Sequence, residues 1–238
     1  MGKEALVKAE VARGFGDVLG TNLIALYAYG SGVDGSLIAG FSDLDVAAFL
    51  AGRPLPDDLF RLHRRLDRPI EPFSYLQVKY IDTTAVAKAT LVPNSFELLA
   101  GQLADEGSYV FRDDELLTEA RRWLEVLPAL VADDGDTWSV AVGGERRLRH
   151  VRLLTTRVKP AVRSWLCLQG VAPTVAFTAN WQQMAELLTP RDRQAGSLIS
   201  HLHSLLPPAD DDAAKEAGEV ALRLLWCLLG DAPADEGR

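Results

Sequence analysis

The chain is poor in the residues that mark secreted and membrane proteins. Its 238 residues include only two cysteines, and Cys167 and Cys227 lie far apart in apolar stretches. This spacing predicts reduced, buried thiols and not a disulfide framework. Because no run of about 18 apolar residues occurs and the N-terminal stretch has no long apolar segment, we expect neither a membrane span nor a secretion signal. We therefore expect a cytoplasmic protein.

Positive charge is also scarce. The formal net charge is −8 and the sequence pI is about 5.1, which argues against a nucleic-acid partner, because such proteins carry a dominant basic surface. An acidic chain can still bind a nucleotide in a local pocket with Mg²⁺, and its surface suits a cationic small substrate. Histidine is rarer still, with four residues. His201 and His203 are two apart on an expected helix, so their side chains point apart and predict no metal pair.

What the chain does contain is an ordinary globular composition. Hydrophobic residues make up 48% and charged residues 24% of the sequence, which is typical of a packed protein. A length of 238 residues is enough for one large or two small domains.

The stretch from residue 30 to residue 45 most strongly implies a chemistry. An apolar run over 23–29 predicts a buried strand, which ends in Gly30-Ser31, and a second apolar run follows Asp43-Leu44-Asp45. Because side chains alternate along a strand, Asp43 and Asp45 point the same way. Two carboxylates on one face repel each other unless a cation lies between them. With Ser42 beside the pair, the arrangement suits Mg²⁺ and a polyphosphate.

The turn after the first strand has a matching role. Glycine at position 30 lets the backbone approach phosphate groups closely, and amide N–H groups at such a turn favour an anion. Ser31 adds a hydroxyl donor. We expect Asp34, a few residues later, to shape the turn.

These motifs resemble those of a known superfamily. The stretches that carry the resemblance are Leu26-Tyr27-Ala28-Tyr29-Gly30-Ser31, Val33-Asp34-Gly35 and Ser42-Asp43-Leu44-Asp45. They are similar to the nucleotidyltransferases related to polymerase β, most closely to the aminoglycoside adenylyltransferases, and they also fit the minimal nucleotidyltransferases of bacteria. The resemblance is specific over about 20–50 and looser to about 130; beyond that it extends only to the architecture.

The resemblance implies an enzyme that uses ATP and Mg²⁺. Asp43 and Asp45 would bind the metal, Gly30, Ser31 and Ser42 would bind the nucleotide, and AMP would pass to a hydroxyl with release of pyrophosphate. The acceptor would be a small molecule such as an aminoglycoside-like antibiotic, or a protein side chain.

The sequence departs from the family at the third carboxylate. Members usually place an acid on the next strand, facing the aspartate pair, to accept the proton of the attacking hydroxyl, and here Gln77 takes that position. A missing general base typically costs about 10² to 10⁴ in rate. Three explanations stay open: another register, with Asp82 or Glu71 as the acid; activation by the metal or by a substrate amine; or nucleotide binding without efficient turnover.

The expected fold is α+β. We expect a small mixed sheet with flanking helices, followed by an all-α bundle that binds the acceptor. Asn94 and Glu97 have the spacing of a capping box, which predicts a helix from 94 to about 107. The expected divisions are a nucleotidyltransferase domain over 1–131, a linker over 132–142, a helical domain over 143–230 and a flexible tail over 231–238.

A basic stripe is expected on the helix over 145–168. At 100° per residue its members lie within about 80° of one another. They are Arg149, Arg152, Lys159 and Arg163. The stripe is either a solvated helix face or a set of contacts to the triphosphate, as basic residues of the helical domain are in the resembled family.

Overall fold

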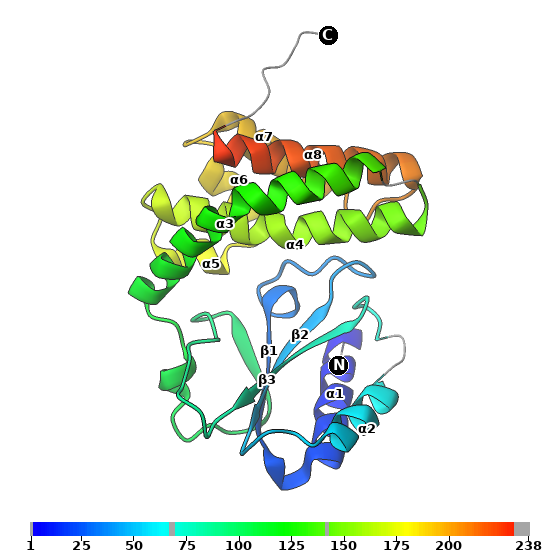
Figure 1. The fold of residues 1–238 in the computed structure, drawn as a ribbon, viewed down its shortest axis with the longest axis vertical. Coiled ribbons are helices and arrows are strands. Elements are labelled where there is room, and N and C mark those ends of the chain that lie inside the picture. Colours follow the sequence, from blue (N-terminus) through cyan, green and yellow to red (C-terminus); the bar gives the residue numbers. More distant parts are fainter. Residues whose placement is uncertain (1, 67–69, 141–142, 231–238) are drawn as a thin grey trace. The chain divides into compact units, whose positions relative to one another are not determined.

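A computed structural model describes residues 2–66, 70–140 and 143–230 of the chain. The elements divide into an N-terminal unit that holds the strands and a C-terminal unit made of helices (Figure 1). The N-terminal unit contains α1 (Lys3–Leu19), β1 (Leu23–Tyr29), β2 (Leu44–Leu50), α2 (Pro56–Leu66), β3 (Leu76–Asp82) and β4 (Phe96–Gly101). The C-terminal unit contains α3 (Asp113–Val140), α4 (Glu145–Leu168), α5 (Pro173–Thr178), α6 (Trp181–Leu188), α7 (Arg193–Ser204) and α8 (Asp211–Leu229).

The strands form a mixed sheet in the order β3-β2-β1-β4. β1 runs antiparallel to both β2 and β4, whereas β2 and β3 are parallel and joined through α2. The antiparallel pairing places the end of β1 beside the start of β2. The parallel pairing places the start of β3 at the same edge. Both halves of the predicted fold class, a small mixed sheet and a following helical bundle, are confirmed.

Each face of the sheet packs against different segments. Leu26, Val46 and Leu50 share a core with Phe15 of α1 and Leu62 of α2, and the two helices lie next to each other (Figure 1). The opposite face packs against the chain between 91 and 109. Because strand side chains alternate, Asp45 lies on this second face, together with Ala47 and Phe49.

The C-terminal unit has its own apolar core. α4 packs against α3 and α8, and α7 packs against α6 and α8 (Figure 1). Side-chain caps define where three of these helices begin: Asn180 accepts from the Gln183 amide, Asp192 from Ala195 and Asp210 from Ala213. Within the part of the chain that the structure describes, each helix is too short or too polar to cross a membrane.

The linker expected over 132–142 is wrong for the residues that the structure describes. α3 continues to Val140, and the two compact units divide between Phe111 and Arg112. The acidic, glycine-containing sequence suggested a break, but Asp134 is buried and forms an ion pair with Arg157 of α4. This partner is distant in sequence. Positions 141–142 and the tail expected over 231–238 lie outside the described residues.

Another sequence expectation differs from the structure. The helix expected from 94 to 107 is wrong, because Phe96–Gly101 forms β4 and pairs with β1. Asn94 adopts a left-handed conformation with φ 60° in the turn before the strand, so it caps no helix. Strand pairing therefore outweighs the local capping signal.

Candidate active site

Three strand ends meet at one edge of the sheet. In the register of the sheet, Tyr29 at the end of β1 pairs with Asp45 near the start of β2, and Asp45 pairs with Gln77 on β3. The end of β1 and the predicted position Gln77 therefore lie beside Asp45. In this register Gln77 is the residue of β3 that lies opposite Asp45.

The turn after β1 fits closely against the acid pair. Gly30 has φ +67°, and a Cβ there would meet Asp45 Oδ2 at 2.7 Å, so only glycine fits without displacing the carboxylate. Ser31 is buried, and its hydroxyl donates to the Asp43 carbonyl at 3.2 Å. Gly30 and Ser31 thus hold the end of β1 directly against the aspartates.

Asp43 and Asp45 face one another across a single amide group. With the Gln77 amide nitrogen directed at the pair, it donates to Asp43 Oδ2 at 2.9 Å and to Asp45 Oδ1 at 3.2 Å. The two carboxylates therefore share one small space, as the alternation along the strand predicted. An oxygen of each carboxylate therefore lies within hydrogen-bond distance of the same amide nitrogen.

Ser42 is placed beside the pair but is engaged in the turn. Its hydroxyl oxygen accepts from the Ile38 amide at 2.9 Å, and its carbonyl accepts from the Ser74 amide at 2.8 Å. A similar local role belongs to Asp34, which accepts from the Ser36 amide at 2.9 Å and shapes the turn as expected. Direct nucleotide binding by Ser42 stays a prediction.

Asp82 is not brought to the pair, so the alternative register that would make it the base is wrong. It pairs with Leu50 at the far end of β2 and accepts from the Thr84 amide and hydroxyl at 2.9 and 2.6 Å. These hydrogen bonds hold the pKa of Asp82 below its usual value. It is five positions after Gln77 on β3, so its side chain points to the opposite face of the sheet, about 17 Å along the strand. Glu71 is exposed in the loop before β3.

Lys8 is a residue of this region that the sequence interpretation missed. Its Nζ lies under the turn and donates to the Gly32 carbonyl at 2.6 Å, to Glu97 Oε2 at 2.7 Å and to Glu4 Oε1 at 2.7 Å. The sequence pattern could have indicated Lys8, because it lies on the same apolar face of the helix as Val11 and Phe15, where a lysine is unusual. Only 8% of its surface is exposed.

Tyr29 was also missed as a neighbour of the pair. Burial raises the pKa of its phenol, and the charges of Asp45 and Asp43 raise it further. The phenol therefore stays protonated near neutral pH and does not serve as the missing base.

The donor set at the edge suits Mg²⁺. Carboxylate oxygens are its preferred protein ligands, and the ion is commonly held by one or two carboxylates together with phosphate oxygens. Over the ranges that the structure describes, no group of three or more His, Cys, Asp or Glu is arranged to hold a metal ion. The two aspartates could therefore hold the ion, with phosphate or water supplying its other ligands.

The basic stripe lies on α4 within the C-terminal unit. Arg149 is exposed, whereas the other three members are half-buried and engaged: Arg163 donates to the Ala179 carbonyl at 2.7 Å, and Lys159 Nζ lies 5.2 Å from the centre of the Trp181 ring. Arg152 also has an interaction partner. The face is therefore partly structural, and its role toward a triphosphate stays a prediction.

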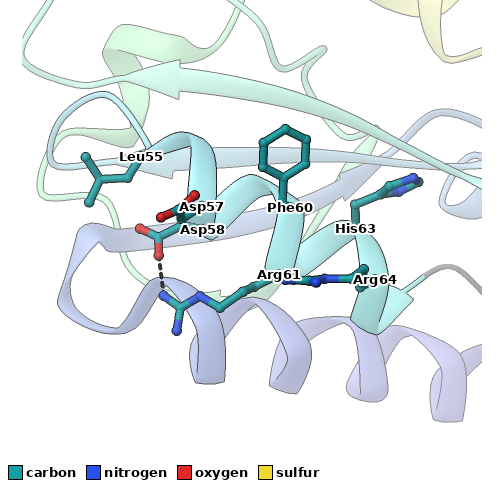
Figure 2. Close-up of a pocket in the computed structure, with 7 residues that line it drawn as sticks. All are labelled: Leu55, Asp57, Asp58, Phe60, Arg61, His63 and Arg64. Atoms are coloured by element: carbon teal, nitrogen blue, oxygen red, sulfur yellow. Dashed lines mark hydrogen bonds and ion pairs between the residues drawn. The ribbon is translucent and has the colours of Figure 1, made fainter.

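A surface hollow on α2 is separate from this site. Figure 2 shows its lining side chains, which come from α2 and from Leu55 just before it, with Asp58 paired to Arg61. Because one helix supplies nearly all of the lining, the hollow lacks the enclosing walls of a nucleotide site.

The fold is a small mixed sheet with flanking helices, followed by a helical unit. Among solved structures, the chain is similar to that of spectinomycin adenyltransferase AAD(9) from Enterococcus faecialis, determined with ATP and spectinomycin. The match covers 96% of this chain and 99% of that chain, with a TM-score of 0.57 and 15% sequence identity. No protein-family model and no curated protein sequence matches the chain. At this identity the likeness shows the fold.

Proposed function

We propose that the protein is a Mg²⁺-dependent nucleotidyltransferase that moves a nucleoside monophosphate, AMP from ATP, to a hydroxyl of a small molecule and releases pyrophosphate. The observation that carries the proposal is the meeting of Asp43 and Asp45 with the Gly30-Ser31 turn at one sheet edge. The fold shared with an adenyltransferase determined with ATP and spectinomycin supports it.

Each part of the edge has a task in this reaction. Asp43 and Asp45 would hold Mg²⁺, which when bound offsets negative charge on the triphosphate. Gly30 brings the backbone close to the phosphates, and Ser31 fixes the turn through its bond to the Asp43 carbonyl. Lys8 holds the same turn from below through the Gly32 carbonyl. These contacts orient the nucleotide before the acceptor reacts.

The acceptor is proposed to be a cationic, aminoglycoside-like molecule. Support comes from the net charge of −8 and from the structural neighbour, which was determined with spectinomycin beside ATP. Residues of the helical unit are proposed to contribute to binding, with Arg149, Arg152, Lys159 and Arg163 as the candidates for triphosphate contacts.

A second function is favoured by one specific observation. Gln77 faces the pair where a third carboxylate would stand, and an amide accepts no proton near neutral pH. A protein with this site would bind Mg²⁺ and nucleotide but turn over slowly, in keeping with a loss of about 10² to 10⁴ in rate without a general base.

Pyrophosphate release separates the two functions. The full-length protein is incubated with ATP, Mg²⁺ and a panel of hydroxyl acceptors that includes spectinomycin and cationic aminoglycosides. An enzyme releases pyrophosphate above the acceptor-free rate with at least one acceptor, and the Asp43→Asn variant loses this activity. Binding of ATP without acceptor-dependent release would favour the second function.

A further inference from the structure

The side-chain amide of Gln77 is assigned with its nitrogen toward the two aspartates, because an amide oxygen there would face only acceptors. A side-chain amide carries two N–H donors, and the contacts at 2.9 Å to Asp43 and 3.2 Å to Asp45 use one donor for each carboxylate. The parallel register keeps Gln77 opposite Asp45, so backbone pairing supports the contact. The amide nitrogen therefore contacts both of the carboxylates that would hold a cation.

This contact has an electrostatic consequence. Two carboxylates on one face repel each other, and an N–H group shared between them offsets part of that repulsion. A divalent ion that arrives alone must break both hydrogen bonds and gains only two protein carboxylates. An ion that arrives with a triphosphate also brings phosphate oxygens as ligands, so its binding is less dependent on the protein.

We propose that Gln77 is a positioning residue that holds the aspartate pair together in the metal-free protein and makes divalent-ion binding depend on the nucleotide. The proposal rests on the proposed function, because it concerns the same site. It assigns Gln77 a role that a carboxylate could not fill. In the metal-free site a third carboxylate would add repulsion, and in the metal-bound site it would be a further ligand of the ion.

Mn²⁺ binding tests the proposal without measuring activity. The loss of the free Mn²⁺ signal in electron paramagnetic resonance gives the affinity, with and without a non-hydrolysable ATP analogue. We expect the wild-type chain to bind Mn²⁺ weakly alone and much more tightly with the analogue. Gln77→Ala removes the competing hydrogen bonds and should bind Mn²⁺ alone about tenfold more tightly than wild type. Gln77→Glu should bind it more tightly still.

The control adds the same charge away from the pair. Gln102 is exposed in the loop after β4, and Gln102→Glu should leave Mn²⁺ affinity at the wild-type value. A damaged fold would lower the affinity and could not produce the expected gain. If wild type binds Mn²⁺ alone as tightly as both Gln77 variants, the proposal is overturned while the proposed function stands. If no variant binds Mn²⁺ even with the analogue, the proposed function itself fails, and this inference with it.

Discussion

Gly30 shows how one backbone conformation sets the geometry of the candidate site. Its φ is +67°, and a side chain at this position would place its Cβ only 2.7 Å from Asp45 Oδ2, which leaves no room for one. The glycine therefore allows both the conformation of the turn and the observed position of the Asp45 carboxylate. Sequence alone indicated a close approach to phosphate but could not show the contact with Asp45, because that contact depends on the pairing of β1 with β2.

Gly30→Ala should separate these two roles. The left-handed conformation costs alanine about 1–2 kcal/mol of stability, and the displaced carboxylate should lower acceptor-dependent turnover by about 10²-fold. Gly40→Ala is the matched control, because Gly40 has φ +71° and open space around its Cβ position. It should lose similar stability, measured by urea unfolding, and keep its turnover. Equal activity losses in both variants would contradict the role of the Asp45 contact.

At the scale of elements, Lys8 ties α1 to the turn after β1 and, through Glu97, to β4. Burial lowers the pKa of Lys8, but hydrogen bonds and charges from Glu4 and Glu97 outweigh burial, so its pKa is raised above the ordinary value. A raised pKa means that the charged lysine stabilises the fold below its unfolded pKa. This contribution is lost as pH rises through the folded pKa.

Lys8→Met should leave the Gly32 carbonyl without its partner and cost about 1–3 kcal/mol in the free energy of unfolding. Nucleotide affinity should fall as well, because the turn loses its support from below, and Lys8→Arg should restore much of both. The difference in stability between wild type and Lys8→Met should be constant near neutral pH and shrink above about pH 10.5. A difference that grows with pH would rule out the charged role.

In the helical unit, the ion pair between Asp134 and Arg157 joins α3 to α4. Asp134→Ala removes the partner of a mostly buried guanidinium and should cost about 3–5 kcal/mol in unfolding free energy. Glu125→Ala, on the exposed surface of the same helix, should change it by less than about 0.5 kcal/mol. Equal small effects would show that the pair contributes little.

A comparison of the elements shows which parts of the fold are determined by the local sequence. β1, β2 and the acid pair follow from alternation and apolar runs, so they were predictable within a few residues. β4 and the full length of α3 were not, because the first depends on pairing with β1 and the second on the buried contact between Asp134 and Arg157. The alignment put Gln77 at the expected base position, but its hydrogen bonds to both aspartates depend on how β2 and β3 pair in three dimensions.

For the whole molecule, the net charge of −8 predicts a salt dependence if the acceptor is cationic. Salt screens long-range attraction, since the Debye length falls from about 10 Å at 0.1 M to about 3 Å at 1 M. The KM for a cationic aminoglycoside acceptor should therefore rise several-fold over this range while kcat changes little. A KM that does not respond to salt would contradict a cationic acceptor and leave nucleotidyl transfer intact.

The central claim is that Asp43 and Asp45 bind a metal–nucleotide complex at this sheet edge. Isothermal titration calorimetry with a non-hydrolysable ATP analogue, with and without Mg²⁺, tests it most directly. Wild type and Asp82→Asn, altered at the far end of β3, should both bind the analogue only when Mg²⁺ is present. The double variant Asp43→Asn, Asp45→Asn should show no Mg²⁺-dependent binding. Binding that is independent of Mg²⁺, or that survives loss of both carboxylates, would contradict the account.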